Sequence, residues 1–179
     1  MTGGPDHAQS VGAELVEVVA PDGTVERVIT RREMRALHAR HRAVFIAVLG
    51  TDGRVLTHQR AADKDVWPSR WDIAFGGVVA VGESWDDSAR RELAEEAGVV
   101  DVELVGVGRG SYDDADASMI SSVYLGVSDG PFEFVDGEVV ATEWVTIDEL
   151  AAIIERLPTD QTEFCPDSLA VVAPILLAR

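Results

Sequence analysis

The chain is poor in cysteine and has no long apolar run. Its 179 residues contain one cysteine, Cys165, so no disulfide can form within the chain. We therefore expect a reducing compartment, the cytoplasm. No apolar run approaches the roughly 18 residues that a membrane-spanning helix needs, and the opening residues MTGGPDHAQS lack the apolar stretch of a secretion signal. These absences argue against a membrane or secreted protein.

Positive charge is also scarce. The chain has 15 basic residues, of which Lys64 is the one lysine, against 32 acidic residues, for a net charge of −17. The imbalance begins after residue 60, since residues 61–179 carry 25 acidic and 7 basic residues. A chain this acidic is not expected to bind a nucleic-acid polymer by neutralising its phosphates. Clustered carboxylates could instead hold a divalent cation.

The length and patterning predict a flexible tail over residues 1–10 and a single domain over residues 11–179. An N-terminal hairpin is expected over 12–31, with its turn at Pro21-Asp22-Gly23. Further strands are expected at 42–50, 55–60, 71–80, 99–110, 119–127 and 138–145, and helices at 31–40, 84–97, 146–157 and 168–179. Strands and helices mix without a regular alternation, which favours an α/β sandwich with a mixed sheet.

Three of these expectations are specific enough to fail. The strands at 42–50 and 55–60 should pair with each other as a hairpin. The strand at 71–80 should be broken by Gly76-Gly77. Residues 111–118, SYDDADAS, should form an acidic loop.

The helix predicted at 84–97 carries the most chemical information. Ser84 is its expected N-cap and Gly98 its expected C-terminal stop. Glu92, Glu95 and Glu96 are spaced i, i+3 and i+4, so they share one helix face and repel one another. A solvated acidic face is one interpretation. A site for Mg²⁺ or Mn²⁺, which prefer carboxylate oxygens, is the other.

The spacing around this helix favours the second interpretation. It reads Gly77-x5-Glu83-x7-Arg91-Glu92-Leu93-x-Glu95-Glu96-x-Gly98-Val99, which resembles the Nudix box at every specified position over 23 residues. The resemblance implies a Nudix α/β/α sandwich with a mixed β-sheet, here preceded by a β-hairpin. It also implies a diphosphate hydrolase that depends on Mg²⁺ or Mn²⁺.

The resemblance assigns roles to particular residues. It implies that Glu92, Glu95 and Glu96 hold the metal together with the backbone carbonyl of Gly77. Arg91 and Glu83 resemble the residues that orient these ligands. The implied reaction is attack of a metal-activated water on a diphosphate, with Glu92, Glu138 and Glu143 as candidates for the general base.

The flanking residues resemble the isopentenyl-diphosphate isomerase-like branch of the superfamily. They share its His41-Arg42-Ala43 strand start, its Gln59-Arg60 strand end, a lysine in the next loop and Trp71 before the site. However, Gly76 and Val78 stand where that isomerase has its Cys and His, and Cys165 lies outside the motif. Hydrolysis is therefore favoured, with isomerisation and non-catalytic ligand sensing as alternatives.

The expected partner is a small-molecule diphosphate, by default a nucleoside diphosphate derivative. The candidates for substrate contact are Arg60, Lys64, Phe75, Tyr112 and Glu143. His41 and His58 fit structural roles better than ligand binding. A homodimer through the N-terminal hairpin or the apolar C-terminal segment is a hypothesis that light scattering can test.

Overall fold

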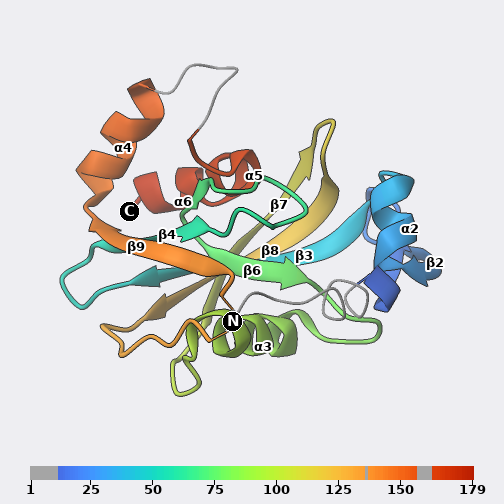
Figure 1. Cartoon of the computed structure of the whole chain (residues 1–179), viewed down its shortest axis with the longest axis horizontal. Helices are drawn as coiled ribbons and strands as arrows, with labels where there is room; N and C mark the ends of the chain where they lie inside the picture. Colours follow the sequence, from blue (N-terminus) through green and yellow to red (C-terminus); the bar gives the residue numbers. More distant parts are fainter. Residues whose placement is uncertain (1–11, 136, 157–162) are drawn as a thin grey trace.

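The structure is a computed structural model that describes residues 12–135, 137–156 and 163–179 (Figure 1). The tail expected at 1–10 lies outside the described residues. The strands are β1 (Leu15–Val19), β2 (Val25–Thr30), β3 (His41–Leu49), β4 (Val55–Arg60), β5 (Trp71–Asp72), β6 (Phe75–Val78), β7 (Val105–Asp113), β8 (Ser118–Val127) and β9 (Val139–Val145). The helices are α2 (Arg31–Ala36), α3 (Trp85–Ala97), α4 (Ile147–Arg156), α5 (Pro166–Val171) and α6 (Ala173–Leu177).

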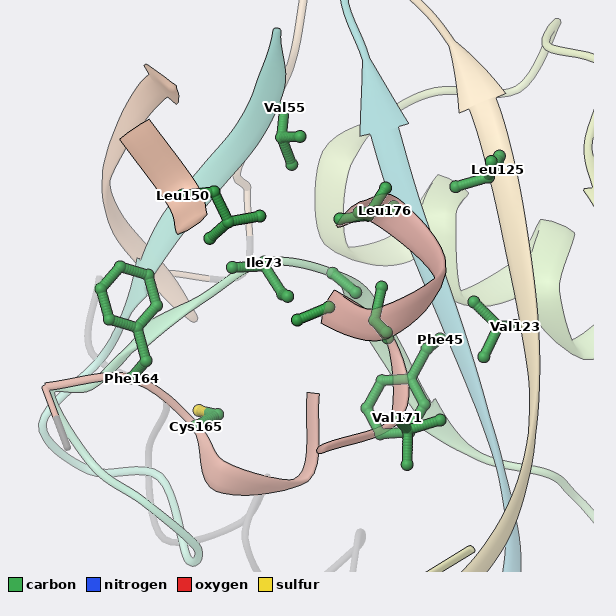
Figure 2. Close-up of a cluster of buried hydrophobic side chains, with 14 of the residues drawn as sticks. Phe45, Val55, Ile73, Val123, Leu125, Leu150, Phe164, Cys165, Val171 and Leu176 are labelled. Carbon is green, nitrogen blue, oxygen red and sulfur yellow. The ribbon is translucent and has the colours of Figure 1, made fainter. Parts of the chain in front are cut away.

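Strand β3 is buried on both faces because apolar residues occupy successive positions along it. Alternate side chains of a strand point to opposite faces. One set, with Phe45 at its centre, joins a cluster with residues of α4, α5 and α6, and Figure 2 shows Phe45, Leu150 and Leu176 within it. The other set, Val44, Ile46 and Val48, joins a cluster with Ala89, Leu93 and Ala97 of α3. The α/β/α sandwich expected from the sequence follows from this division.

The sheet is mixed, as expected. β3 pairs in parallel with β8 and antiparallel with β6, and β7 extends the sheet beyond β8. The hairpin of β1 and β2 forms at the predicted place and joins the sheet through β1 and β3. Helix α2 packs on this hairpin, where Met34 is buried with Val16 and Val18.

The expected hairpin of β3 and β4 forms only at its closed end. Leu49 and Val55 pair beside the turn, and beyond them the two strands take other neighbours. β3 pairs with β6 and β8, whereas β4 pairs along its length with β9. The strand at 71–80 is interrupted, but the break lies at Ile73 and Ala74. There the Asp72 side chain accepts hydrogen bonds from both backbone amides, at 2.8 and 3.3 Å.

Two strand boundaries were also wrong. β7 begins at Val105 rather than at residue 99, because Val102 and Leu104 pack against the α3 cluster ahead of the strand. At its other end β7 continues to Asp113, so part of the expected acidic loop is strand. Tyr112 and Asp113 pair there with Met119 and Ser118 of β8.

The predicted ends of α3 and the predicted start of α4 are confirmed, whereas the helix predicted at 31–40 ends at Ala36 and the C-terminal helix begins at Pro166 instead of residue 168. Ser84 caps α3 by accepting a hydrogen bond from the Asp87 amide, and Gly98 ends the helix with φ 68°. Thr146 and Glu149 form reciprocal hydrogen bonds at the start of α4. The C-terminal helix is divided into α5 and α6 near Pro174, as expected. None of the described helices is long and apolar enough to span a membrane.

Candidate active site

Two glycines of β6 bring the strand backbone directly against the carboxylates of α3. The Gly76 amide donates a hydrogen bond to Glu96 Oε2 at 3.0 Å. A Cβ atom at Gly77 would lie 2.4–2.5 Å from the carboxylate atoms of Glu92. Real Cβ atoms do not approach other atoms this closely, so the position of Glu92 requires glycine at residue 77. The glycines therefore admit the glutamates instead of breaking the strand.

Arg91 donates hydrogen bonds to three glutamates of the box. Its Nε and Nη2 atoms each donate to the Glu83 carboxylate at 2.9 Å. Its Nη1 atom donates to Glu92 at 2.8 Å and to Glu95 at 3.1 Å. The hydrogen bonds from Arg91 lower the pKa of Glu83, and those to Glu83 raise the pKa of Arg91. The geometry suits the orienting role expected for Arg91 and Glu83, which stays a prediction.

Two of the three expected metal ligands are buried. Glu92 is 8% exposed and Glu96 is 9% exposed, whereas Glu95 lies at the surface. Burial raises the pKa of Glu92 and raises that of Glu96 to about 8, because charged carboxylates are poorly solvated there. A bound cation would offset this cost, since hard divalent cations prefer carboxylate oxygens. The donor chemistry therefore fits the expected Mg²⁺ or Mn²⁺.

The side chains do not converge on a metal position in this arrangement. Within residues 12–135, 137–156 and 163–179, no group of three or more His, Cys, Asp or Glu side chains is placed to hold a metal ion. Arg91 accounts for part of this, because it binds one oxygen each of Glu92 and Glu95. Each of these two carboxylates keeps a second oxygen that Arg91 does not bind and that a cation could use.

The glutamates form one side of a cavity of about 610 Å³. Its lining combines the acidic residues of α3 with basic residues from the N-terminal half and with apolar residues. Among them are Glu92, Glu95, Glu96, Gly77, Arg31, Arg35, Arg60, Lys64, Val66, Trp67 and Met119. A cavity of this size suits a small molecule. Its lining contains the glutamates of α3 as well as several arginines and Lys64.

Two of the five candidates for substrate contact line this cavity. Arg60 donates from Nη2 to the Val66 carbonyl at 3.2 Å, and its Nη1 lies 3.9 Å from Asp72. Lys64 forms an ion pair with Glu138, which also lines the cavity. Both cations thus lie at the cavity wall, each beside a carboxylate, and their contact with substrate stays a prediction.

The other three candidates lie elsewhere, and we correct them here. Phe75 is a core residue, 1% exposed, whose ring stacks on His58 at a centroid distance of 4.4 Å. Tyr112 donates to Asp114 at 2.6 Å and is not part of the cavity lining. Glu143 is exposed on β9 and also lies outside the lining, which removes it as a candidate base.

Several charged residues of the cavity escaped the sequence interpretation. Arg31 and Arg35 come from α2, whose i, i+4 spacing of arginines was the available signal. Asp72 and Asp167 line the same cavity, and burial near Asp72 raises the pKa of Asp167 to about 8. No sequence pattern joins residues 72 and 167, because only the packing of α5 beside β5 brings them together.

Comparison with known proteins agrees with this geometry. The sequence model of the NUDIX domain matches residues 39–167. The uncharacterized Nudix hydrolase YfcD of Salmonella typhi is 35% identical over 160 residues, which cover 89% of this chain and 83% of that protein. The uncharacterized Nudix hydrolase PA4841 of Pseudomonas aeruginosa is 31% identical over 163 residues, covering 91% and 94%. The crystal structure of DR0079 from Deinococcus radiodurans has the same fold, with a TM-score of 0.73 at 24% identity, covering 91% of this chain and 97% of that one.

Proposed function

Because this chain belongs to the NUDIX domain family, we propose that it hydrolyses a diphosphate linkage in a small molecule, with Mg²⁺ or Mn²⁺ as cofactor. One observation carries the proposal. The Glu92 carboxylate lies against the backbone of Gly77 and is held by Arg91, at the wall of a cavity large enough for a nucleoside diphosphate derivative. The Nudix box residues are therefore assembled as one unit.

The residues of the chain supply distinct parts of the reaction. Glu92, Glu95 and Glu96, with the Gly77 carbonyl, would hold the cation. When bound, a divalent cation supplies charge neutralisation at the phosphates and a more acidic water. Arg91 fixes Glu92 and Glu95 through hydrogen bonds to one oxygen of each. The positively charged Arg60 and Lys64 can bind phosphate oxygens of the substrate.

The water must lose a proton to a carboxylate within the cavity. Glu92 and Glu138 both line it and are the candidate bases that the arrangement retains. Glu138 is paired with Lys64, which lowers the pKa of Glu138 against the opposing effect of its burial. A low pKa keeps this carboxylate ionised and able to accept a proton.

No observation favours the isomerase alternative. At residue 76, where the isomerase would carry its cysteine, a Cβ atom would lie 2.0 Å from the Val44 carbonyl oxygen. The atoms nearest to this Cβ are backbone atoms of Val44 and Phe45 in β3, which cannot easily move aside, so this strand pairing leaves no room for a side chain. Cys165 is fully buried, and burial together with Asp72 raises its pKa. It does not line the cavity, so it is poorly placed to move a proton on substrate carbon.

A substrate screen with matched variants tests the proposed hydrolysis. Nucleoside di- and triphosphates, dinucleotides and prenyl diphosphates would be incubated with the protein and Mg²⁺ or Mn²⁺. We expect hydrolysis of at least one diphosphate compound that EDTA abolishes and that Glu95→Gln reduces at least about 100-fold. Glu103→Gln, which removes an exposed carboxylate after α3, is the control and should retain full activity.

Three outcomes would contradict the proposal. Double-bond migration in a prenyl diphosphate would favour the isomerase alternative. Tight binding of a compound without turnover, unchanged in Glu95→Gln, would favour a ligand sensor. Hydrolysis that Glu95→Gln and Glu96→Gln both retain would show that the site lies elsewhere.

A further inference from the structure

The cations of the cavity wall differ in whether a carboxylate accompanies them. Arg31 pairs with Glu14 at 3.0 Å. Arg60 lies 3.9 Å from Asp72, and Lys64 pairs with Glu138. Arg91 is held by Glu83 and two glutamates of α3. Their charges are thus largely balanced within the chain.

Arg35 is the exception in the part of the chain that the structure describes. It lines the cavity from α2, yet its guanidinium forms no ion pair or hydrogen bond with any described residue. The Nε atoms of Arg31, Arg35 and Arg60 are all buried without a partner, but Arg31 and Arg60 each have a carboxylate beside another guanidinium nitrogen. Burial and the neighbouring charges of Arg31 and Arg60 lower the pKa of Arg35 to about 10. The Arg35 side chain is half-buried. Partial removal of a guanidinium from water without an anion is costly, so this position favours an anionic ligand.

The acidic residues near Arg35 do not supply that anion. Asp65 and Asp167 are the carboxyl groups that act on it, and neither forms an ion pair with it. Burial and the neighbouring Asp72 carboxylate raise the pKa of Asp167, which disfavours its charged form.

Arg35 also lies where two hollows of the surface meet. A second, more open hollow of about 780 Å³ shares Arg31, Arg35, Val66 and Trp67 with the first one. Its lining adds Arg32 and Arg70 together with Asp65 and Asp116, so that four arginines face two aspartates there. A ligand whose diphosphate lies beside the glutamates of α3 can therefore extend past Arg35 toward this basic opening.

We propose that Arg35 binds a second anionic group of the substrate, a phosphate monoester separate from the diphosphate that is cleaved. The inference rests on the proposed function for the substrate class. The anion site itself can be tested without any catalytic turnover. Its chemical basis is that a guanidinium donates paired hydrogen bonds to phosphate oxygens, with Arg31 adding positive charge beside it.

Binding of inorganic phosphate in EDTA tests the anion site without metal and without catalysis. Calorimetry would compare the full-length protein with three variants. We expect saturable binding that Arg35→Gln weakens at least tenfold and that Arg35→Lys partly restores. Arg27→Gln, which removes an exposed positive charge from β2, should bind phosphate as the wild type does. Circular dichroism would establish that each variant is folded.

Two matched ligand pairs test the substrate class. NADPH and NADH share a diphosphate linkage and differ by one phosphate monoester, as do coenzyme A and its dephospho form. In at least one pair we expect the wild type to bind the phosphate-bearing member about tenfold more tightly. Arg35→Gln should remove that difference, and Arg27→Gln should preserve it.

The outcomes separate this inference from the proposed hydrolysis. Equal phosphate binding by the wild type and Arg35→Gln, or no saturable binding by the wild type, would overturn the anion site whether or not the protein hydrolyses diphosphates. A preference in neither pair, or one that Arg35→Gln retains, would overturn the substrate class. A lack of hydrolysis in the screen would leave the phosphate result intact.

Discussion

The absence of a side chain at residue 77 decides where the key carboxylate lies. Glu92 packs against the Gly77 backbone so closely that a Cβ atom would overlap its carboxylate. Arg91 then holds that carboxylate from its other side at 2.8 Å. Gly77 leaves space for the Glu92 carboxylate, and Arg91 holds that carboxylate by a hydrogen bond. The two contributions can be tested by separate substitutions.

Gly77→Ala should displace Glu92 and leave the fold intact. The added methyl group would meet carboxylate atoms at 2.4–2.5 Å, and the Glu92 side chain can move. We expect a loss of hydrolytic activity of about 100-fold, because small misplacements of a reacting group have large effects on rate. Gly106→Ala is the control, since its added Cβ would make only an ordinary contact with Tyr124 at 3.6 Å. Full activity in Gly77→Ala would contradict the assigned position of Glu92.

Glu83→Gln should weaken the support of the site without removing a proposed ligand. The amide keeps the size of the carboxyl group but loses the charge that anchors Arg91 through two hydrogen bonds of 2.9 Å. We expect activity to fall about 10- to 100-fold and the Mg²⁺ concentration for half-maximal activity to rise. A Mg²⁺ titration of activity measures both effects. An unchanged titration would assign Glu83 no orienting role.

Helix α3 is the element that carries the box, and its two ends are fixed locally. Ser84 begins it, Gly98 ends it, and between them Ala89, Leu93 and Ala97 pack on the sheet. The Tyr124 hydroxyl of β8 donates to Asp86 at 2.5 Å, which ties the first turn to the sheet. These contacts fix the direction in which the glutamates project.

Ser84→Ala should destabilise the protein by about 1 kcal/mol, the usual effect of losing an N-cap hydrogen bond. The affected bond is the one that the Asp87 amide donates to the Ser84 hydroxyl at 3.1 Å. Urea unfolding monitored by tryptophan fluorescence measures the change. Ser111→Ala, at an exposed position of β7, should alter the free energy of unfolding by less than about 0.5 kcal/mol. Equal effects of the two substitutions would show that the cap contributes nothing particular.

At the scale of the whole molecule, burial shifts the pKa values of histidines and of carboxyl groups in opposite directions. Burial lowers the pKa of His41 and His58 to about 4. It raises the pKa of Asp167 and Glu96 to about 8. The histidines therefore weaken the native state as the pH falls from 6.5 toward 4, because the unfolded chain takes up their protons first. The acids act in the opposite direction, since the native state keeps their protons as the pH rises toward 8.

His58→Phe should isolate one of these contributions. In the wild type, His58 is neutral in the core at pH 5 whereas the unfolded chain is protonated, which reduces stability relative to pH 7. The variant lacks this effect, so we expect it to gain about 2 kcal/mol relative to the wild type between pH 7 and pH 5. Urea unfolding at both pH values measures the difference. Phe75→Leu, which disturbs the same stacked pair without removing a titrating group, should show the same deficit at both.

The homodimer expected from the N-terminal hairpin or the C-terminal segment stays a prediction that light scattering can decide. The charge distribution has a clearer outcome. The cations of residues 1–60 and the acids of α3 line one cavity. Basic residues from the N-terminal part of the sequence and acidic residues of α3 are thus brought together around the same cavity.

The sequence by itself determined the features that depend on neighbours along the chain. The caps of α3, the turn of the N-terminal hairpin and the spacing of Glu92, Glu95 and Glu96 are local, so a few adjacent residues specify each of them. The same locality made the NUDIX box recognisable before any packing was known. It also explains why the interruption of the C-terminal helix near Pro174 could be anticipated from the sequence.

Only the tertiary structure decided which residues share the cavity. Arg35 and Asp167 are separated by most of the chain, and they meet because α2 packs on the first hairpin while α5 packs beside β5. Phe75 and Glu143 were selected from the sequence as candidates for substrate contact. In the structure Phe75 lies in the core and Glu143 is exposed to solvent. Gly76 and Gly77 admit the glutamates because α3 folds back against β6. Contacts of this kind arise from burying apolar faces far apart in the chain, and no local pattern records them.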